Sequence, residues 1–378
     1  MIGQRLRTAE SVAAGHPDKL ADRIVDEILD AALTSDPQAR VAAEAALSHR
    51  SLTLLGEISL DGALDLPAAI ARAILSAGWR QERWPLTFEE QRIEIAQQSR
   101  EIARGIERNE ASDRYDQLGA GDQGSVIGYA TDEHPSLIPA PLFYAHQLMR
   151  AHHDRVLDGR SLLGPDAKAQ VSVSYQPDGK PQAIETIVIS SMHRAGITHD
   201  QLVSEVSEHL LNTLPQELVT AGARIMINPA GSWTVGGPAA DSGLSGRKLA
   251  VDSYGGIGRH GGGAWSGKDP SKVDRSGAYA ARQAAVSLIR SGLAREVEVS
   301  ISYAIGIARP VAVSVDSFGS GALPDERLAA LISEKIDLRP QAIIEHLDLR
   351  RPIYAMLASF GQVGRLDYLL PWERAVEL

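Results

Sequence analysis

The sequence predicts an α+β fold of three similar domains, because one order of elements occurs three times. Two β-like segments followed by a helical segment recur along the chain, and the first strands begin at residues 41, 169 and 297. These starts are about 128 residues apart, far beyond the period of a solenoid repeat. We interpret the pattern as three units that each place helices on one face of a small sheet. Equal spacing by chance is the alternative, since strand–strand–helix order is common.

The first unit begins with a helix and continues with two strands. Apolar residues from Leu20 to Leu33 recur at helical spacing, which predicts a helix that starts soon after Pro17. Strands are expected at residues 41–47 and 52–58, followed by a helix at 67–77.

The other two units show the same signals. The turn Pro177-Asp178-Gly179-Lys180 separates two β-like segments and indicates a hairpin. The expected elements are strands 169–175 and 183–190 with a helix 201–214, then strands 297–305 and 311–315 with a helix 326–335. Glycine and proline mark residues 119–128 and 229–237 as interdomain segments or active-site loops. We expect domains at 1–110, 111–231 and 232–378, and leave open whether they interleave in space.

The composition excludes several classes of protein. Hydrophobic residues make up 44% of the chain and charged residues 23%. No apolar stretch is long enough for a membrane span, and no apolar segment near the N-terminus resembles a secretory signal, so no membrane partner is expected. The chain has no cysteine, which excludes disulfides, thiolate metal sites and cysteine nucleophiles. That absence fits a reducing compartment, and we expect a cytoplasmic location.

The charges are unevenly distributed. The formal net charge is −10, which argues against nucleic acid as a partner. Between Arg247 and Arg282, however, seven basic residues outnumber three acidic ones. A local cationic cluster in an acidic protein indicates a small polyanionic ligand.

Residues 255–270 form the densest glycine-rich segment. Glycines let backbone N–H groups approach a ligand closely, which is how anions are bound. The run from Gly262 to Lys268 matches the start of a Walker A loop, but Asp269 stands where Ser or Thr must hold Mg²⁺, and Pro270 resists a helix. We therefore reject a P-loop and keep Lys268 as a phosphate ligand. A flexible linker is the alternative, which the charged residues just after Lys268 weaken.

Three further motifs each allow a functional and a structural interpretation. In Gly15-His16-Pro17-Asp18-Lys19, the carboxylate can take Mg²⁺ and the imidazole can donate to a phosphate or ribose oxygen. Alternatively, Asp18 complements the helix dipole and His16 is structural. The glycine loop around Asp122 is either a lid or a tight turn. Asp166-Ala167-Lys168, and Asp241 followed by Gly246-Arg247-Lys248, are either site residues or solvated charges.

Taken together, these motifs resemble the S-adenosylmethionine synthetase (methionine adenosyltransferase) family. The order and spacing match over nearly the whole chain. The matching stretches are Glu10-Ser11-Val12, residues 15–22, Gly56-Glu57-Ile58, residues 119–124 and 128–131, Pro165-Asp166-Ala167-Lys168, Ile227-Asn228-Pro229, Gly236-Gly237-Pro238, Gly243-Leu244, Gly246-Arg247-Lys248, residues 252–282, Asp348-Leu349 and Pro371-Trp372-Glu373.

The resemblance implies a fold, a reaction and an assembly. Three α+β domains surround a pseudo-threefold axis, and homodimers, often paired into tetramers, form active sites between subunits. The methionine sulfur attacks C5′ of ATP with tripolyphosphate as leaving group, and hydrolysis then gives phosphate and diphosphate with S-adenosylmethionine. Each site is expected to use two Mg²⁺ and one K⁺. Tripolyphosphate carries about four negative charges, which explains the need for several cations.

The resemblance also implies residue roles. The phosphate ligands are Lys168, Arg247, Lys248 and Lys268, and His16 donates to the leaving oxygen. The other expected ATP contacts are Asp166, Ser232, Trp233, Asp241 and Ala264. The methionine pocket corresponds to Glu57, Gln98, Asp241 and Lys272. Asp18 and Asp274 are the expected Mg²⁺ ligands, Glu44 is the K⁺ ligand, and Asp122 lies on the loop that gates entry.

The chain departs from the family's usual pattern at a few positions. Residues 80–90 differ, and this segment precedes Gln98. Ala43 and Ala45 stand beside Glu44 where the family tends to have Cys and Thr, and Ser232 stands where Arg is usual. Trp265 replaces Phe, and residues 360–365 lack the usual His-Phe. All phosphate and metal positions are retained, so an active enzyme is expected.

Two other functions compete with this interpretation. A phosphotransferase or NTPase that uses residues 262–268 is disfavoured by Asp269-Pro270. A non-catalytic paralogue that binds partner subunits is disfavoured by the retained site residues.

Overall fold

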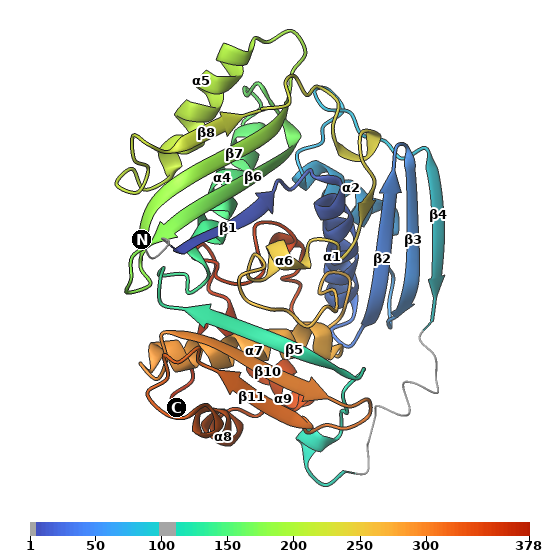
Figure 1. The fold of residues 1–378 in the computed structure, drawn as a ribbon. Helices are drawn as coiled ribbons and strands as arrows, with labels where there is room; N and C mark the ends of the chain where they lie inside the picture. The colour runs from blue at the N-terminus through green and yellow to red at the C-terminus, as the bar shows by residue number, and fades with distance from the viewer. Residues whose placement is uncertain (1–4, 98–110) are drawn as a thin grey trace.

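The computed structural model describes residues 5–97 and 111–378, and it has the α+β fold that the sequence predicts. Within these residues the strands form three sheets, of order β4-β3-β2-β9, β1-β6-β7-β8 and β11-β10-β5, around the short helix α6 (Leu249–Asp252) (Figure 1). The strands are β1 (Arg5–Val12), β2 (Arg40–Ser48), β3 (Ser51–Ser59), β4 (Glu90–Ala96), β5 (Gly124–Thr131), β6 (Leu163–Tyr175), β7 (Pro181–His193), β8 (Arg224–Ile227), β9 (Gly243–Leu244), β10 (Glu296–Tyr303) and β11 (Ala312–Asp316).

Each sheet is built on one pair of predicted strands and receives a strand from a different unit. The hairpins are the antiparallel pairs β2–β3, β6–β7 and β10–β11. The first unit's β1 pairs with β6 of the second, the second unit's β5 pairs with β10 of the third, and the third unit's β9 pairs with β2 of the first. This cyclic exchange of strands relates the three sheets by a pseudo-threefold arrangement. The unit boundaries at 110/111 and 231/232 stay predictions.

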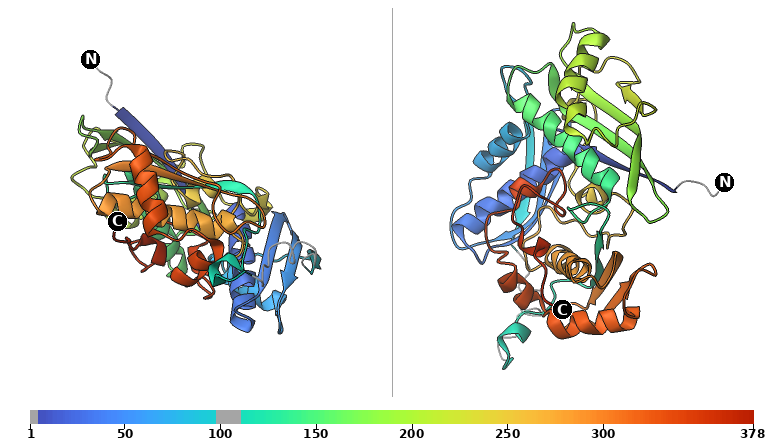
Figure 2. Two further views of the ribbon diagram at one scale, coloured as in Figure 1. Left: turned by 90° about the horizontal axis from the view of Figure 1, so that it is seen from below. Right: turned by 90° about the vertical axis from the view of Figure 1, so that its left-hand side faces the viewer.

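One long helix covers each sheet and a second helix follows each hairpin. The long helix α1 (Pro17–Ser35) packs on β2 and β9, α4 (Ala140–Leu157) on β6 and β1, and α7 (Val273–Arg290) on β10 and β5. The right-hand view of Figure 2 shows α4 lying across its sheet. The helices after the hairpins are α2 (Leu66–Ser76), α5 (His199–His209) and α8 (Asp325–Lys335), and α9 (Pro340–His346) follows α8.

Local sequence explains where α1 begins. The His16 side chain caps the helix, and Pro17 occupies the first turn. Proline is tolerated there because the first N–H groups of a helix have no intrahelical partner. Asp18 in the first turn complements the helix dipole. The apolar positions Leu20 and Ile24 are fully buried, so the predicted amphipathic helix is confirmed.

The predicted strands and helices all occur, mostly with small shifts at their ends, but β6 begins six residues earlier than predicted and so includes Asp166 and Lys168. The helix expected to reach Leu214 ends at His209, and a 3₁₀ turn, Leu211–Thr213, follows it. The long helices α4 and α7 were missed by the sequence analysis. Helix α4 has only a weak one-sided apolar pattern, because polar residues are spread around it. No helix in residues 5–97 or 111–378 is long and apolar enough to cross a membrane.

Candidate active site

Four aspartates at four-residue intervals line one face of α1, and we call them the aspartate ladder: Asp18, Asp22, Asp26 and Asp30. Residues four apart lie one turn above each other on a helix. Each carboxylate accepts a backbone N–H from a distant loop: Leu244 (3.0 Å), Gly246 (2.7 Å), Gly267 (2.8 Å) and Ala355 (2.8 Å), in ladder order. The ladder therefore fixes two loops, 243–248 and 263–268, that carry the predicted phosphate ligands.

Asp18 is the centre of the first group of site residues. Its carboxylate is buried, and it accepts a hydrogen bond of 2.6 Å from Lys248 Nζ. Arg247 Nε lies 3.5 Å from the other carboxylate oxygen. His16, at the start of the same helix, accepts the backbone N–H of Asp18 on Nδ1 at 3.2 Å. The Asp18 carboxylate thus brings two cations from a distant loop close to the imidazole at the start of α1.

Electrostatics fix the protonation of this group. Burial, followed by the charges of Lys248 and Lys168, lowers the pKa of His16 to about 3. The imidazole is therefore neutral near pH 7, and because Nδ1 accepts a hydrogen bond, Nε2 carries the proton and is a donor. Burial raises the pKa of Asp18, but the hydrogen bonds from Lys248 and Leu244 outweigh it and leave the pKa below its usual value.

Asp166 and Lys168 reach this group from β6. Asp166 Oδ2 accepts the backbone N–H of Gly237 at 2.8 Å, while the buried Oδ1 has no hydrogen-bond partner within the described part of the chain. Burial raises the pKa of Asp166 to about 7, and Lys168, Asp241 and Asp18 lie close enough to influence it. Asp241 and Lys168 are both exposed, so both are accessible to a ligand.

Lys268 and Asp274 form a second group, joined by an ion pair of 2.6 Å. Lys268 pairs with Ala42 beside β2, which extends that sheet by one bridge. Asp274 lies in the first turn of α7, close to Gly263. A Cβ at Gly263 would lie 2.2 Å from Asp274 Oδ1, so this close approach requires glycine.

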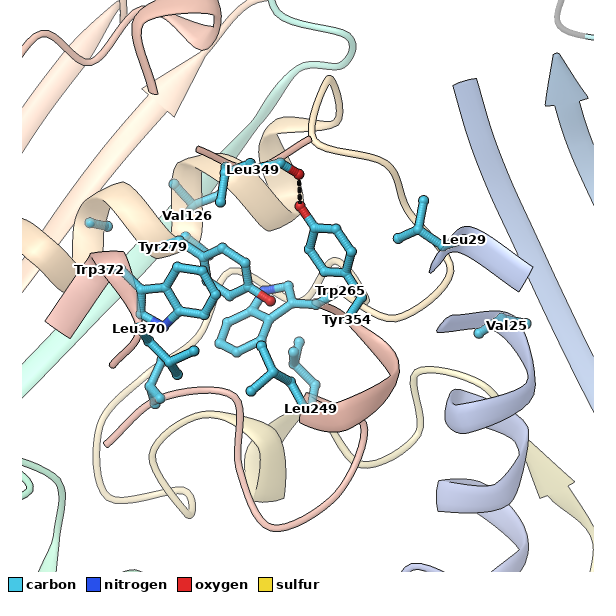
Figure 3. Close-up of a cluster of buried hydrophobic side chains, with 14 of the residues drawn as sticks. Val25, Leu29, Val126, Leu249, Trp265, Tyr279, Leu349, Tyr354, Leu370 and Trp372 are labelled. Carbon is cyan, nitrogen blue, oxygen red and sulfur yellow. Dashed lines mark hydrogen bonds between the residues drawn. The ribbon is translucent and has the colours of Figure 1, made fainter. Parts of the chain in front are cut away.

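The loop that carries Lys268 is anchored by buried aromatic rings (Figure 3). Trp265 packs edge-on against Tyr279 of α7, and Tyr279 stacks on Trp372 with ring centroids 3.8 Å apart. Asp269 is buried and accepts the backbone N–H of Val41 and the Nζ of Lys272, at 2.7 and 2.6 Å. Asp269 is thus a structural residue, and the helix starts only at Val273. The rejection of a P-loop is confirmed.

Two glutamates lie on one face of the sheet beside Lys268. Glu57 of β3 is opposite Ala42, and Glu44 is two residues further along β2. Side chains two residues apart on a strand share a face. Glu44 accepts a short hydrogen bond from the Ser245 hydroxyl. Ala264 packs against Gly246, where a Cβ would lie 2.6 Å from the alanine methyl, so the two loops also meet there.

The remaining predicted residues are not joined to these groups by any hydrogen bond among the described residues. Trp233 donates its backbone N–H to His193 Nε2 at 3.1 Å, beside a cavity of about 350 Å³ that includes Ser232. Asp122 is exposed, and the neighbouring Gly121 approaches the backbone of Ser271. Gln98 lies outside the described residues.

Sequence analysis missed the residues that organise the site. Asp26 receives a bidentate ion pair from the buried Arg275, at 2.8 and 2.9 Å. Lys19 is fully buried between Asp22 (2.9 Å) and Asp252 (2.5 Å). The available signal was the regular four-residue spacing of aspartates along a helix that is otherwise rich in apolar residues.

The donor set bears on the expected metal ions. No cluster of three or more His, Asp or Glu side chains that could hold an ion occurs in residues 5–97 and 111–378. Asp18 and Asp274 stand apart as single carboxylates, each paired with a lysine. Mg²⁺ commonly uses one or two carboxylates and completes its shell with water and substrate phosphates. The residues present fit that mode of binding.

Comparison with known proteins covers almost the whole chain. Family models described as the N-terminal, central and C-terminal domains of S-adenosylmethionine synthetase match residues 4–101, 117–233 and 235–374. A protein named S-adenosylmethionine synthase from Desulforudis audaxviator is 44% identical over 382 residues, which cover 99% of this chain and 96% of the relative. One of the same name from Clostridium botulinum is 43% identical over 380 residues, covering 98% of this chain and 97% of the relative.

Proposed function

The chain belongs to the S-adenosylmethionine synthetase family, whose members are enzymes, and we propose that it joins ATP and methionine with tripolyphosphate as leaving group. The methionine sulfur donates its lone pair to C5′ of the ribose, and the C5′–O bond breaks as the triphosphate departs intact. Water then cleaves the tripolyphosphate to phosphate and diphosphate. The Asp18 group carries this proposal, because Lys248 and Arg247 meet one carboxylate beside a neutral histidine at the start of the same helix.

Stabilisation of the departing charge is the main contribution of these residues. A thioether is a weak nucleophile, so the rate depends on alignment of the reacting atoms and on electrostatic stabilisation of the leaving group. Lys168, Arg247 and Lys248 come from two different segments and supply positive charge on one side. The Nε2–H of His16 is free to donate to the leaving oxygen, and its low pKa means that it donates a hydrogen bond and keeps its proton.

Divalent ions would complete this charge balance. We propose that Asp18 and Asp274 hold Mg²⁺ and that Glu44 holds K⁺. When bound, these ions neutralise the phosphate oxygens and orient the chain of phosphates. Lys248 and Lys268, which pair with the two aspartates here, would then be released to bind the phosphates directly.

A homodimer would bring the two groups of residues into one site. The Asp18 group and the Lys268–Asp274 pair share no hydrogen bond or ion pair among the described residues, although both line loops held by α1. We propose that the Asp18 group of one subunit faces the Lys268, Glu57 and Lys272 side of the other. ATP would span the two, with Trp233 and Ala264 near the nucleotide. The oligomeric state, whether dimer or tetramer, stays a prediction. The gating role of Asp122 and the cytoplasmic location also stay predictions.

One assay tests the proposal. The purified chain is incubated with ATP, methionine, Mg²⁺ and K⁺, and mass spectrometry detects the sulfonium nucleoside. We expect one sulfonium product per ATP, with phosphate and diphosphate in equal amounts. Release of phosphate without a sulfonium product would instead favour a phosphotransferase or NTPase, and no turnover at all would favour a non-catalytic paralogue.

A further inference from the structure

The third sheet lacks a strand that the other two sheets possess. In the first sheet β4 lies parallel to β3, and in the second sheet β8 lies parallel to β7. In both cases the fourth strand follows the helix after the hairpin, α2 or α5. In the third sheet the chain leaves α8 through the buried residues Ile336 and Leu338 and enters α9. Within residues 5–97 and 111–378, no strand lies beside the outer edge of β11.

A groove occupies the place of this strand, and we call it the β11 groove. It runs between the edge of β11 and α8 and has a volume of about 560 Å³. Its lining combines residues 310–315 of the strand segment with Asp325, Glu326, Ala329, Ala330 and Ser333 of α8. Val311 at its start is 61% exposed. The groove therefore offers backbone hydrogen-bonding groups beside apolar side chains such as Val313 and Ala329.

Edge strands normally carry features that prevent pairing with another chain. Lysines, prolines within the strand and bulges are the usual ones. The segment Ala312–Asp316 contains neither lysine nor proline, and its only charged residue is Asp316 at the end. An open edge of this kind binds extended peptides by adding a strand, with backbone hydrogen bonds for affinity and alternate side chains for specificity.

We propose that the β11 groove binds an extended peptide of a partner protein as a fourth, parallel strand. The two related sheets define the direction, because both β4 and β8 run parallel to their neighbours. The two related sheets also indicate the side chains of the peptide. Branched aliphatic residues occupy alternate positions in β4, at Ile93 and Ile95, and in β8, at Ile225 and Ile227. The surface of the groove accommodates such side chains against Val313, Ala329 and Ala330.

Charge defines one end of the peptide. The first turn of α8 lies beside the end of β11, because Asp325 Oδ1 accepts the backbone N–H of Ser317 at 3.2 Å. Asp325 and Glu326 of this turn line the groove, whereas the carboxylate of Asp316 lies 4.0 Å from Arg259. A peptide parallel to β11 therefore places its C-terminal end beside the carboxylates of Asp325 and Glu326. The partner segment carries a lysine or arginine at that end, after alternating aliphatic residues.

Hydrogen exchange on the full chain tests this proposal with synthetic peptides blocked at both ends. The probe TITITIK has alternating isoleucines and a C-terminal lysine, and KITITIT is its reversed control of identical composition. We expect TITITIK to slow exchange of the amides in residues 311–316 by at least about tenfold at saturation. The reversed peptide should bind about fivefold more weakly, the scale of misplacing one exposed charge. A third peptide, TITPTIK, should not bind, since proline removes an N–H.

Variants of the groove separate this site from the rest of the molecule. Ala329→Trp fills the groove and should abolish protection by TITITIK without changing synthase activity. If that variant folds poorly, Ala330→Lys tests the same point, because its charge repels the lysine of the peptide. No protection of residues 311–316 by TITITIK would overturn the proposal, as would tighter binding of KITITIT, which indicates antiparallel pairing. Concentration-dependent protection of these amides without peptide would also overturn it, because it identifies a second copy of the chain as the occupant.

Discussion

The ion pair between Asp26 and Arg275 lets the role of the aspartate ladder be tested by a single atom change. Asp26→Asn keeps the shape of the side chain and removes its charge. Arg275 donates to both carboxylate oxygens, at 2.8 and 2.9 Å, and neither side chain is more than 1% exposed. After the substitution, the hydrogen-bond acceptors left for Arg275 are neutral ones, the amide of Gln362, the hydroxyl of Tyr279 and a backbone carbonyl.

The expected loss of stability follows from the burial of this ion pair. Removing one partner of a buried ion pair costs about 3–5 kcal/mol, because the remaining charge is left uncompensated. We expect the apparent free energy of unfolding by urea to fall by that amount. Gly267 N–H also bonds to Asp26, and Arg275 bonds to the carbonyl of Lys268. Misplacement of Lys268 should therefore lower turnover by at least about tenfold, even well below the unfolding temperature.

Two controls distinguish the buried charge from a general effect of substitution. Asp65→Asn changes an exposed aspartate that caps α2, and asparagine caps helices as well as aspartate does, so stability should stay near that of the wild type. The double variant Asp26→Leu with Arg275→Leu should recover much of the lost stability, because apolar replacement of a whole buried pair is often neutral. A loss below about 1 kcal/mol for Asp26→Asn would refute the reasoning, since a buried guanidinium cannot lose its counter-ion so cheaply.

Three further predictions concern the site residues and the pH dependence of stability. Lys268→Ala or Asp274→Ala should lower turnover at least about 10²-fold, the scale of one transition-state electrostatic contact; near-wild-type turnover in both variants would contradict their assigned roles. The ring of His16 should stay neutral, with its proton on Nε2, down to pH 5 in nitrogen NMR spectra, because its pKa is lowered to about 3; protonation near pH 6.5 would contradict this. Burial raises the pKa of Asp30 to about 7, so its stabilising contribution is complete below the unfolded pKa and is lost as the pH rises through 7. Asp30→Asn should therefore make the decline in unfolding free energy between about pH 4 and pH 7 shallower, and an unchanged slope in urea titrations would exclude this residue as a source.

The three hairpins could be predicted from sequence because their signals are local. Alternating apolar residues in β2 and a turn such as Pro177-Asp178-Gly179-Lys180 act over a few residues. The exchanged strands could not be predicted in this way. Strand β9 has two residues, Gly243 and Leu244, and its pairing with β2 connects positions about 200 residues apart along the chain. Only the tertiary structure brings them together.

The candidate site shows the same division. His16, Lys168 and Lys268 stand in recognisable motifs, so they could be proposed as site residues from the amino-acid sequence alone. The support beneath them could not, because Asp22 and Asp26 act through backbone N–H groups of loops that lie more than 200 positions away. Such contacts leave no composition signal at the loop. The regular spacing of aspartates along a helix otherwise rich in apolar residues was the one visible sign.

The strand exchange explains why the Asp18 group draws on all three units. Strand β1 of the first unit pairs with β6 of the second, and its register places Val12 opposite Lys168. The chain then reaches His16 within four residues, held by a hydrogen bond from Ala13 N–H to the Ala167 carbonyl at 2.9 Å. A slip of one residue in this register would turn Lys168 to the other face of the sheet. Lys248 joins them from the third unit, next to the strand β9 that pairs with β2. The exchanged strands are therefore the means by which three similar folds, none of which contains the group alone, assemble it.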